Sequence, residues 1–297
     1  MPTHTPSVLE RVQEERMQGP STRKRLYQQL ENEIGRPVVS FFTSLTRPSM
    51  MEDTDADMLE GVLQTMDLSD GFALFLSSYG GYGEAAERIV NVCRNASGTG
   101  EFWAIVPGKA KSAATMVCFG SSKIWMGASS ELGPIDPQLT VLEDGRRKTF
   151  SIWNIVRSYE DLFKRAVREQ GNLEPYIQQL QKYDYREIQE FQSAILLSED
   201  IAVRSLKSGM MRRRSEKTIK SQIKIFLTPQ RTKSHGRPIY RDEAADCGLV
   251  IEPMEISTKI GQLVYELHLR LNTFVSSSAY KCIESRQEAF ASPFEDR

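Results

Sequence analysis

Ser112 stands where an apolar segment changes into a run of small and apolar residues, and a serine at such a junction can act as a nucleophile. Residues 103–106 (WAIV) predict a strand, a Pro-Gly-Lys turn follows, and AATMVCFG after Ser112 has the composition of a buried helix. The first N–H groups of a helix have no intrahelical acceptor, and the helix dipole is positive there. This environment favours an attacking alkoxide and an oxyanion. Serine is also a preferred helix N-cap, which is the competing interpretation.

A second turn that could bind an anion lies in residues 76–90, LSSYGGYGEAAERIV. Glycines between a strand and a helix let the backbone approach a ligand closely and offer N–H donors. Gly81 is a natural donor to a carbonyl oxygen that becomes negative during acyl transfer, and the N–H of Ala113 would be the second donor. GGYG also fits a phosphate cradle or an ordinary turn, but it has neither the Walker Lys-Ser/Thr ending nor a G-x-G-x-x-G pattern.

The elements that must position these turns alternate between strand and helix in the first half of the chain. Strands are predicted at 37–43, 71–76, 102–106 and 123–126, and helices at 55–66, 84–93 and 113–119. This order predicts parallel βαβ units with right-handed crossovers, and therefore an α/β fold. Helical periodicity dominates from residue 151 to 227. A polar loop (229–238), a helix (241–250), a strand (249–254), a last helix (260–275) and a Ser-rich charged tail are predicted to follow.

Three segments together resemble the serine dehydrogenase proteinase family: LSSYGGYGEAAERIV, VPGKAKSAATMVCFGSSKIWMGASSELGPIDPQL and HGRPIYRDEAADCGLV. That family belongs to the Clp protease/crotonase superfamily and is related to signal peptide peptidase A. The resemblance covers residues 36–253 and is tightest over 72–139. It implies a β-β-α spiral core, Ser112 as the nucleophile, Gly81 and Ala113 as the oxyanion-hole donors, and assembly into rings or other homo-oligomers.

The general base departs from the family pattern. Caseinolytic Clp peptidases place a histidine after the short strand that follows the nucleophile helix, where this chain has Asp136 in GPIDPQ. Their catalytic aspartate precedes a segment similar to YRDEAADCGLV, where this chain has His235. One hypothesis is a swapped pair, in which His235 reaches Ser112 and Asp136 orients it. Signal peptide peptidase relatives use a lysine farther along the chain, for which Lys148 and Lys164 are the nearest candidates, and Lys148 is taken as the alternative base. Without the resemblance, Asp136 between two prolines is equally a turn residue, and His235 a loop residue.

The predicted organisation combines this core with helical additions. It comprises an N-terminal helical arm (1–35), a Clp/crotonase-like core (36–150), a long helical segment expected to supply oligomer contacts (151–228), a return to the core (229–255), and a C-terminal helix and tail (256–297).

The composition of the chain limits the kinds of partner and the cellular compartment that we expect. The 297 residues carry 38 Lys+Arg and 39 Asp+Glu, a net charge of -1, which argues against a general nucleic-acid or anionic-membrane binder. The four cysteines form no CxxC pair and indicate buried free thiols in a reducing compartment. The three histidines are not at metal-ligand spacing, so we expect no metal and no organic cofactor. Neither a signal-peptide core nor an apolar membrane span is present, which predicts a cytoplasmic protein.

These features predict a serine endopeptidase that forms an acyl-enzyme on Ser112, needs no ATP of its own, and acts as a homo-oligomer on peptide or protein substrates. A partner protein could gate it. Two alternatives stay open. A crotonase-type thioester enzyme would share the oxyanion hole but needs no nucleophilic serine. A catalytically silent Clp-fold subunit for assembly or recognition is favoured by the missing histidine after the nucleophile helix.

Overall fold

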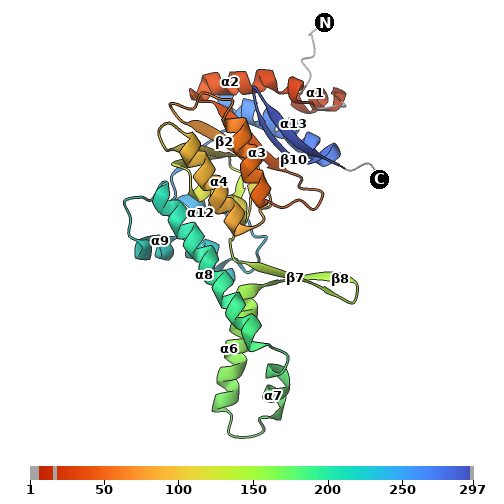
Figure 1. Ribbon diagram of the computed structural model, residues 1–297, viewed down its shortest axis with the longest axis vertical. Coiled ribbons are helices and arrows are strands. Elements are labelled where there is room, and N and C mark those ends of the chain that lie inside the picture. The colour runs from red at the N-terminus through yellow and green to blue at the C-terminus, as the bar shows by residue number, and fades with distance from the viewer. Residues whose placement is uncertain (1–6, 16–18, 295–297) are drawn as a thin grey trace.

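Seven strands form the central sheet of the computed structural model, which describes residues 7–15 and 19–294 (Figure 1). The start of the predicted N-terminal arm, with His4, and the last three residues of the predicted tail lie outside this description. Across the sheet the strands are β11 (Ala289–Pro293), β10 (Ala279–Ser285), β1 (Val38–Thr43), β2 (Phe72–Ser77), β3 (Phe102–Val106), β5 (Lys123–Met126) and β9 (Ile251–Pro253). The five from β1 to β9 are parallel, and β10 and β11 are antiparallel. The predicted α/β fold is confirmed.

Helices cover both faces of this sheet. Alternate strand residues point to opposite faces, so on β1 Val39 and Phe41 belong to one buried cluster and Val38 and Phe42 to the other. The first cluster is shared with α3 (Asp53–Leu63), α4 (Gly83–Ala96), α5 (Ala113–Phe119) and α8 (Tyr185–Ser208), and the second with α2 (Lys24–Ile34) and α13 (Lys259–Ser277). Burial on both faces explains why β2 reads FALFLS, with no polar alternation until its last residue.

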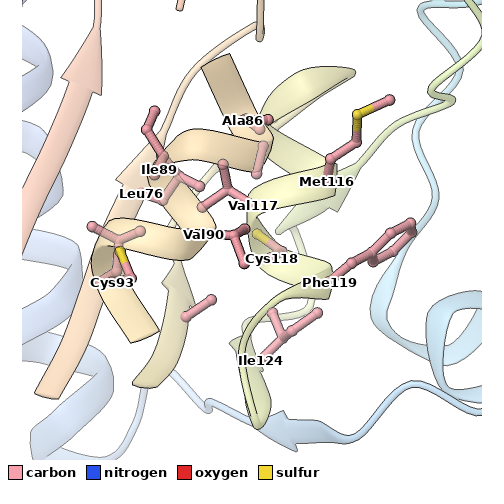
Figure 2. Close-up of a cluster of buried hydrophobic side chains, with 14 of the residues drawn as sticks. Leu76, Ala86, Ile89, Val90, Cys93, Met116, Val117, Cys118, Phe119 and Ile124 are labelled. Atoms are coloured by element: carbon pink, nitrogen blue, oxygen red, sulfur yellow. The ribbon is translucent and has the colours of Figure 1, made fainter. Parts of the chain in front are cut away.

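Helix α5 is buried on every side. All seven of its residues are buried, as expected for a helix that is apolar all round. Figure 2 shows Val117 and Cys118 of α5 among the apolar side chains of α4, including Ile89 and Val90. A Cβ at Gly120 would lie 2.4 Å from a Val90 methyl group, so α5 ends against α4 with no room for a side chain. This packing fixes the helix that begins directly after Ser112.

A second, smaller ladder lies beyond the carboxyl ends of the central strands. Ser78 pairs with Ala110, β4 (Lys109–Ala110) pairs with β6 (Glu131–Leu132), and Leu132 pairs with Ile239. The chain therefore passes from β2 through Ser78 into α4, and from β3 through β4 into α5. Each unit is a main strand, a short second strand and a helix, which is the β-β-α repeat that the resemblance implied.

An arm projects from the body that holds the sheet (Figure 1). It consists of the hairpin β7 (Gln138–Glu143) and β8 (Arg146–Ser151) with α6 (Ile152–Arg168) and α7 (Glu174–Leu180). Helix α8 leads from the arm back along the body, where it packs on α4 and α5. The remaining helices are α1 (Val8–Glu14), a 3-10 turn (Pro20–Thr22), α9 (Glu216–Gln222), α10 (Lys224–Leu227), α11 (Pro229–Thr232) and α12 (Arg241–Asp246). Among the described residues, no helix is long and apolar enough to cross a membrane.

The C-terminal tail predicted within 256–297 is wrong. After α13 the chain forms β10 and β11, and β10 pairs with β1 inside the central sheet. The charged residue Glu284 in β10 made this segment look like a surface tail in the sequence, so no strand was predicted there. Its carboxylate accepts a hydrogen bond of 2.8 Å from the Arg23 guanidinium, and both side chains are almost completely buried. A partner so distant in the chain cannot be recognised from local composition.

Candidate active site

Ser112 occupies a strained junction between β4 and α5. Its backbone has φ 50° and ψ -123°, in a region that costs a residue with a side chain about 1–3 kcal/mol. An N-cap residue normally has an extended backbone, and its side-chain oxygen accepts a hydrogen bond from the first turn. Ser112 has neither property, since its φ is positive and its hydroxyl makes no capping hydrogen bond. The capping interpretation is wrong, and the hydroxyl is free to face the hollow that Ser112 lines.

Gly80 allows the two candidate turns to touch. Its φ is +95°, and a Cβ there would lie 2.5 Å from the Lys111 carbonyl oxygen and 2.8 Å from the Ala113 nitrogen. Two hydrogen bonds hold the preceding residues in place. The Ser78 N–H donates to the Lys109 carbonyl at 2.9 Å, and the Lys111 N–H donates to the Ser78 carbonyl at 3.0 Å. The glycine-rich turn thus lies against the backbone on both sides of Ser112.

Gly81 and Ala113, the predicted oxyanion donors, line the same hollow as Ser112. Within the described part of the chain, neither backbone N–H donates to a protein acceptor. The next residue, Tyr82, does have one, since its N–H donates to the Met51 carbonyl at 3.0 Å. Two unpaired donors beside a serine are what the oxyanion of an acyl-transfer reaction requires.

His235 and Asp136 are hydrogen-bonded to each other. His235 Nδ1 lies 2.8 Å from Asp136 Oδ1; the Asp136 side chain is 1% exposed, and that of His235, which lines the hollow with Ser112, is 28% exposed. With Nδ1 held by the carboxylate, Nε2 is the nitrogen left to exchange a proton with a hydroxyl. The other described histidine, His268, is buried against Phe42, and burial lowers its pKa to about 4.

The short second ladder brings these two residues together. Leu132 and Ile239 form an antiparallel bridge with two N–H···O bonds of 3.0 Å. This bridge brings the segment that carries Asp136 alongside the segment that carries His235, and the two side chains meet there. The Thr115 hydroxyl of α5 also accepts a hydrogen bond of 3.0 Å from the Gly133 N–H, so the Asp136 segment is bound to the helix that follows Ser112.

Two further residues contact the Asp136 carboxylate, and neither was predicted from the sequence. Gln138 Nε2 donates to Asp136 Oδ2 at 2.6 Å, and Ser151 Oγ donates to the same oxygen at 2.8 Å. Gln138 ends the ELGPIDPQ motif, which was a signal that could have been followed. Ser151 carried no signal, because only the hairpin brings it back to Asp136.

Neither Lys148 nor Lys111 lines the hollow beside Ser112. Lys148, the alternative base, is a half-exposed residue of β8 that pairs with Glu143 at 2.5 Å and does not line the hollow. Lys111 turns from Ser112 toward Glu131, 2.8 Å away, and toward the Leu132 carbonyl, 3.0 Å away. Burial lowers the pKa of Lys111, while Glu131 opposes that shift. Among the residues described, no cluster of three or more His, Cys, Asp and Glu side chains could hold a metal ion.

The hollow beside Ser112 has a volume of about 400 Å³ and a mostly apolar wall. Helix α8 contributes one side of it, and α5, the glycine-rich turn, residues 49–50, residues 135 and 137–138, and His235 contribute the rest. The apolar residues that line it include Met50, Tyr79, Tyr82, Met116, Ile135, Ala194, Leu197 and Ile201. A wall of this kind can accept an apolar side chain next to the nucleophile.

No family model matches the chain, and no curated protein matches it. Among solved structures, a ClpP1 variant from Listeria monocytogenes is 13% identical, with 81% of this chain and 98% of that chain covered and a TM-score of 0.40. A variant of the 1510-N membrane-bound stomatin-specific protease is 15% identical, with 69% and 92% covered and a TM-score of 0.30. A second variant of that protease, in complex with a substrate peptide, is 14% identical, with 74% and 93% covered and a TM-score of 0.29.

Proposed function

We propose that this chain is a serine endopeptidase in which Ser112 is the nucleophile, His235 the general base and Asp136 the residue that orients the histidine. One observation carries the proposal. A strained serine with a free hydroxyl, two unpaired backbone donors and a histidine held by a buried carboxylate border a single hollow, although they come from separate parts of the chain.

The reaction would follow the course of acyl transfer. Ser112 Oγ attacks the peptide carbonyl while His235 Nε2 takes the hydroxyl proton, and the tetrahedral oxyanion accepts hydrogen bonds from the Gly81 and Ala113 N–H groups. Collapse of this intermediate breaks the C–N bond, and His235 returns the proton to the leaving amine. A water molecule, deprotonated by His235, then hydrolyses the acyl-enzyme and restores Ser112.

His235 is a better base for this chemistry than Lys148. His235 lines the hollow, and its ring is oriented by a carboxylate, whereas Lys148 lies on the hairpin in an exposed ion pair.

The proposal includes the finer expectations from the sequence. The apolar wall of the hollow supports a peptide substrate with an apolar residue at the scissile bond. The arm exposes Phe163, Val167, Leu173 and Ile177, which supports homo-oligomer contacts through α6 and α7. All four cysteines are free and buried, in keeping with a cytoplasmic protein, and membership of the serine dehydrogenase proteinase family belongs to the same proposal.

Two features favour the peptidase over the alternatives. A thioester enzyme of the crotonase type has no use for a strained serine and a histidine held by a carboxylate. The silent-subunit alternative depended on the absence of a histidine after the helix that follows Ser112. His235, from another part of the chain, lines the hollow beside Ser112 instead.

Labelling with a fluorophosphonate probe tests the proposal. We expect wild-type protein to be labelled at Ser112, the Ser112→Ala variant to remain unlabelled, and a Ser49→Ala variant to be labelled normally. Ser49 is the control because it is another serine that lines the hollow. Folded wild-type protein that is not labelled, or labelling that persists in Ser112→Ala, would contradict the proposal.

A further inference from the structure

We propose that Ser151 and Gln138 are positioning residues that hold the Asp136 carboxylate in the orientation that serves His235. This inference rests on the proposed peptidase function. Asp136 Oδ1 accepts from His235, and Oδ2 accepts from Ser151 and Gln138. Oδ1 therefore contacts His235, and Oδ2 is held by two donors. These donors prevent the carboxylate from rotating about the Cβ–Cγ bond.

Burial makes these donors important. The Asp136 side chain is 1% exposed, so water cannot replace a lost hydrogen bond. A buried carboxylate stays ionised only where donors and positive charge compensate for the lost hydration. The hydroxyl of Ser151 and the amide of Gln138 supply that compensation without adding a second charge to the site.

Ser151 is placed where its hydroxyl would ordinarily do something else. It is the N-cap residue of α6, with an extended backbone of φ -68° and ψ 123°, the conformation in which serine usually accepts a hydrogen bond from the first turn. No such bond is present, and the hydroxyl donates to Asp136 instead. The Ser151 hydroxyl therefore stabilises the Asp136 carboxylate and does not cap α6.

One backbone register positions both donors. Gln138 and Ser151 are cross-strand partners at the base of the β7–β8 hairpin. The Ile152 N–H closes this base by donating to the Pro137 carbonyl at 3.0 Å. The base of the projecting arm is thus the structure that carries the donors to Asp136.

The experiment compares the rate of fluorophosphonate labelling, as a function of pH, in Ser151→Ala, Gln138→Leu and Ser151→Thr. We expect Ser151→Ala and Gln138→Leu each to label about tenfold more slowly, the value of one hydrogen bond to a charged group. The pH profile of labelling should also change, because the carboxylate that orients His235 has lost one of its donors. Ser151→Thr retains the hydroxyl and should recover the wild-type profile.

Thr149→Ala is the matched control. Thr149 lies on the same strand, and its hydroxyl is 2.9 Å from that of Thr140 across the hairpin, away from Asp136. The control should label within about twofold of wild type, since an exposed hydrogen bond contributes little. Melting temperatures of all variants separate a loss of folding from a loss of positioning.

A pH titration of the His235 ring by NMR separates this inference from the proposed function. If Ser151→Ala and Gln138→Leu fold, label at the wild-type rate across the pH range and leave the His235 titration unchanged, the positioning role is overturned. If wild type is never labelled but the variants shift the His235 titration, the positioning stands and the peptidase proposal fails.

Discussion

The nucleophile half of the candidate site and its acid–base half are built in different ways. Gly81, Ser112 and Ala113 come from consecutive units of the sheet, and their turns are held by backbone contacts against a buried helix. Asp136 and His235 are 99 residues apart, and side-chain hydrogen bonds at the base of the arm complete their arrangement. The geometry of the first half should change only when the backbone of the central body moves. The geometry of the second half can be altered by removing one polar side chain.

Asp136→Asn should give the largest effect among the variants that retain Ser112. The amide has the size of the carboxylate but would present the wrong partner to His235 Nδ1 and favour the wrong tautomer, so we expect labelling at Ser112 to slow by on the order of 10⁴. The labelling rate and the melting temperature are the measurements. Asp67→Asn is the control, because Asp67 accepts hydrogen bonds from the neighbouring Ser69 and does not line the hollow. A loss of less than tenfold would show that the acid–base half is not needed.

Gly80→Ala should damage the nucleophile half through the backbone. The new Cβ would lie 2.5 Å from the Lys111 carbonyl oxygen, and shifting that turn by about 1 Å is expected to slow labelling by about 10². Gly35→Ala is the matched control, since Gly35 also has a positive φ (+69°) but nothing within 4 Å of the added atom.

Both glycine variants should lose about 1–2 kcal/mol in the free energy of unfolding from the positive φ. Only Gly80→Ala should also lose labelling, as measured by denaturant unfolding and probe kinetics on the same samples. Equal labelling rates in the two variants would mean that contact between the turns does not position Ser112.

Lys148→Ala should give the smallest effect. Its ion pair with Glu143 is half-exposed, so we expect the free energy of unfolding to change by less than about 1 kcal/mol and the labelling rate by less than about twofold. A loss of labelling rate comparable to that of Asp136→Asn would indicate that Lys148, and not His235, is the base.

Local patterns were sufficient for the elements that surround the nucleophile. The alternation of strands and helices predicted the parallel sheet, and α5, α12 and α13 were predicted within a few residues of their observed bounds. The same patterns failed for β10 and β11, where a Ser-rich, charged segment enters the sheet because Arg23 compensates the buried Glu284. Burial of a charge depends on a partner, and the partner is remote.

The sequence by itself determined that a serine begins a buried helix beside a glycine-rich turn, because strand and helix periodicity and backbone freedom are local properties. It offered His235 and Asp136 only through a resemblance, with Lys148 as the alternative. Tertiary structure alone decided that the Ser112 hydroxyl is not a cap, that Asp136 faces His235, and that Gln138 and Ser151 share its second oxygen. The reason is register. The antiparallel bridge between Leu132 and Ile239 and the base of a hairpin set which side chains meet, and neither pairing is encoded in the spacing of the residues that it joins.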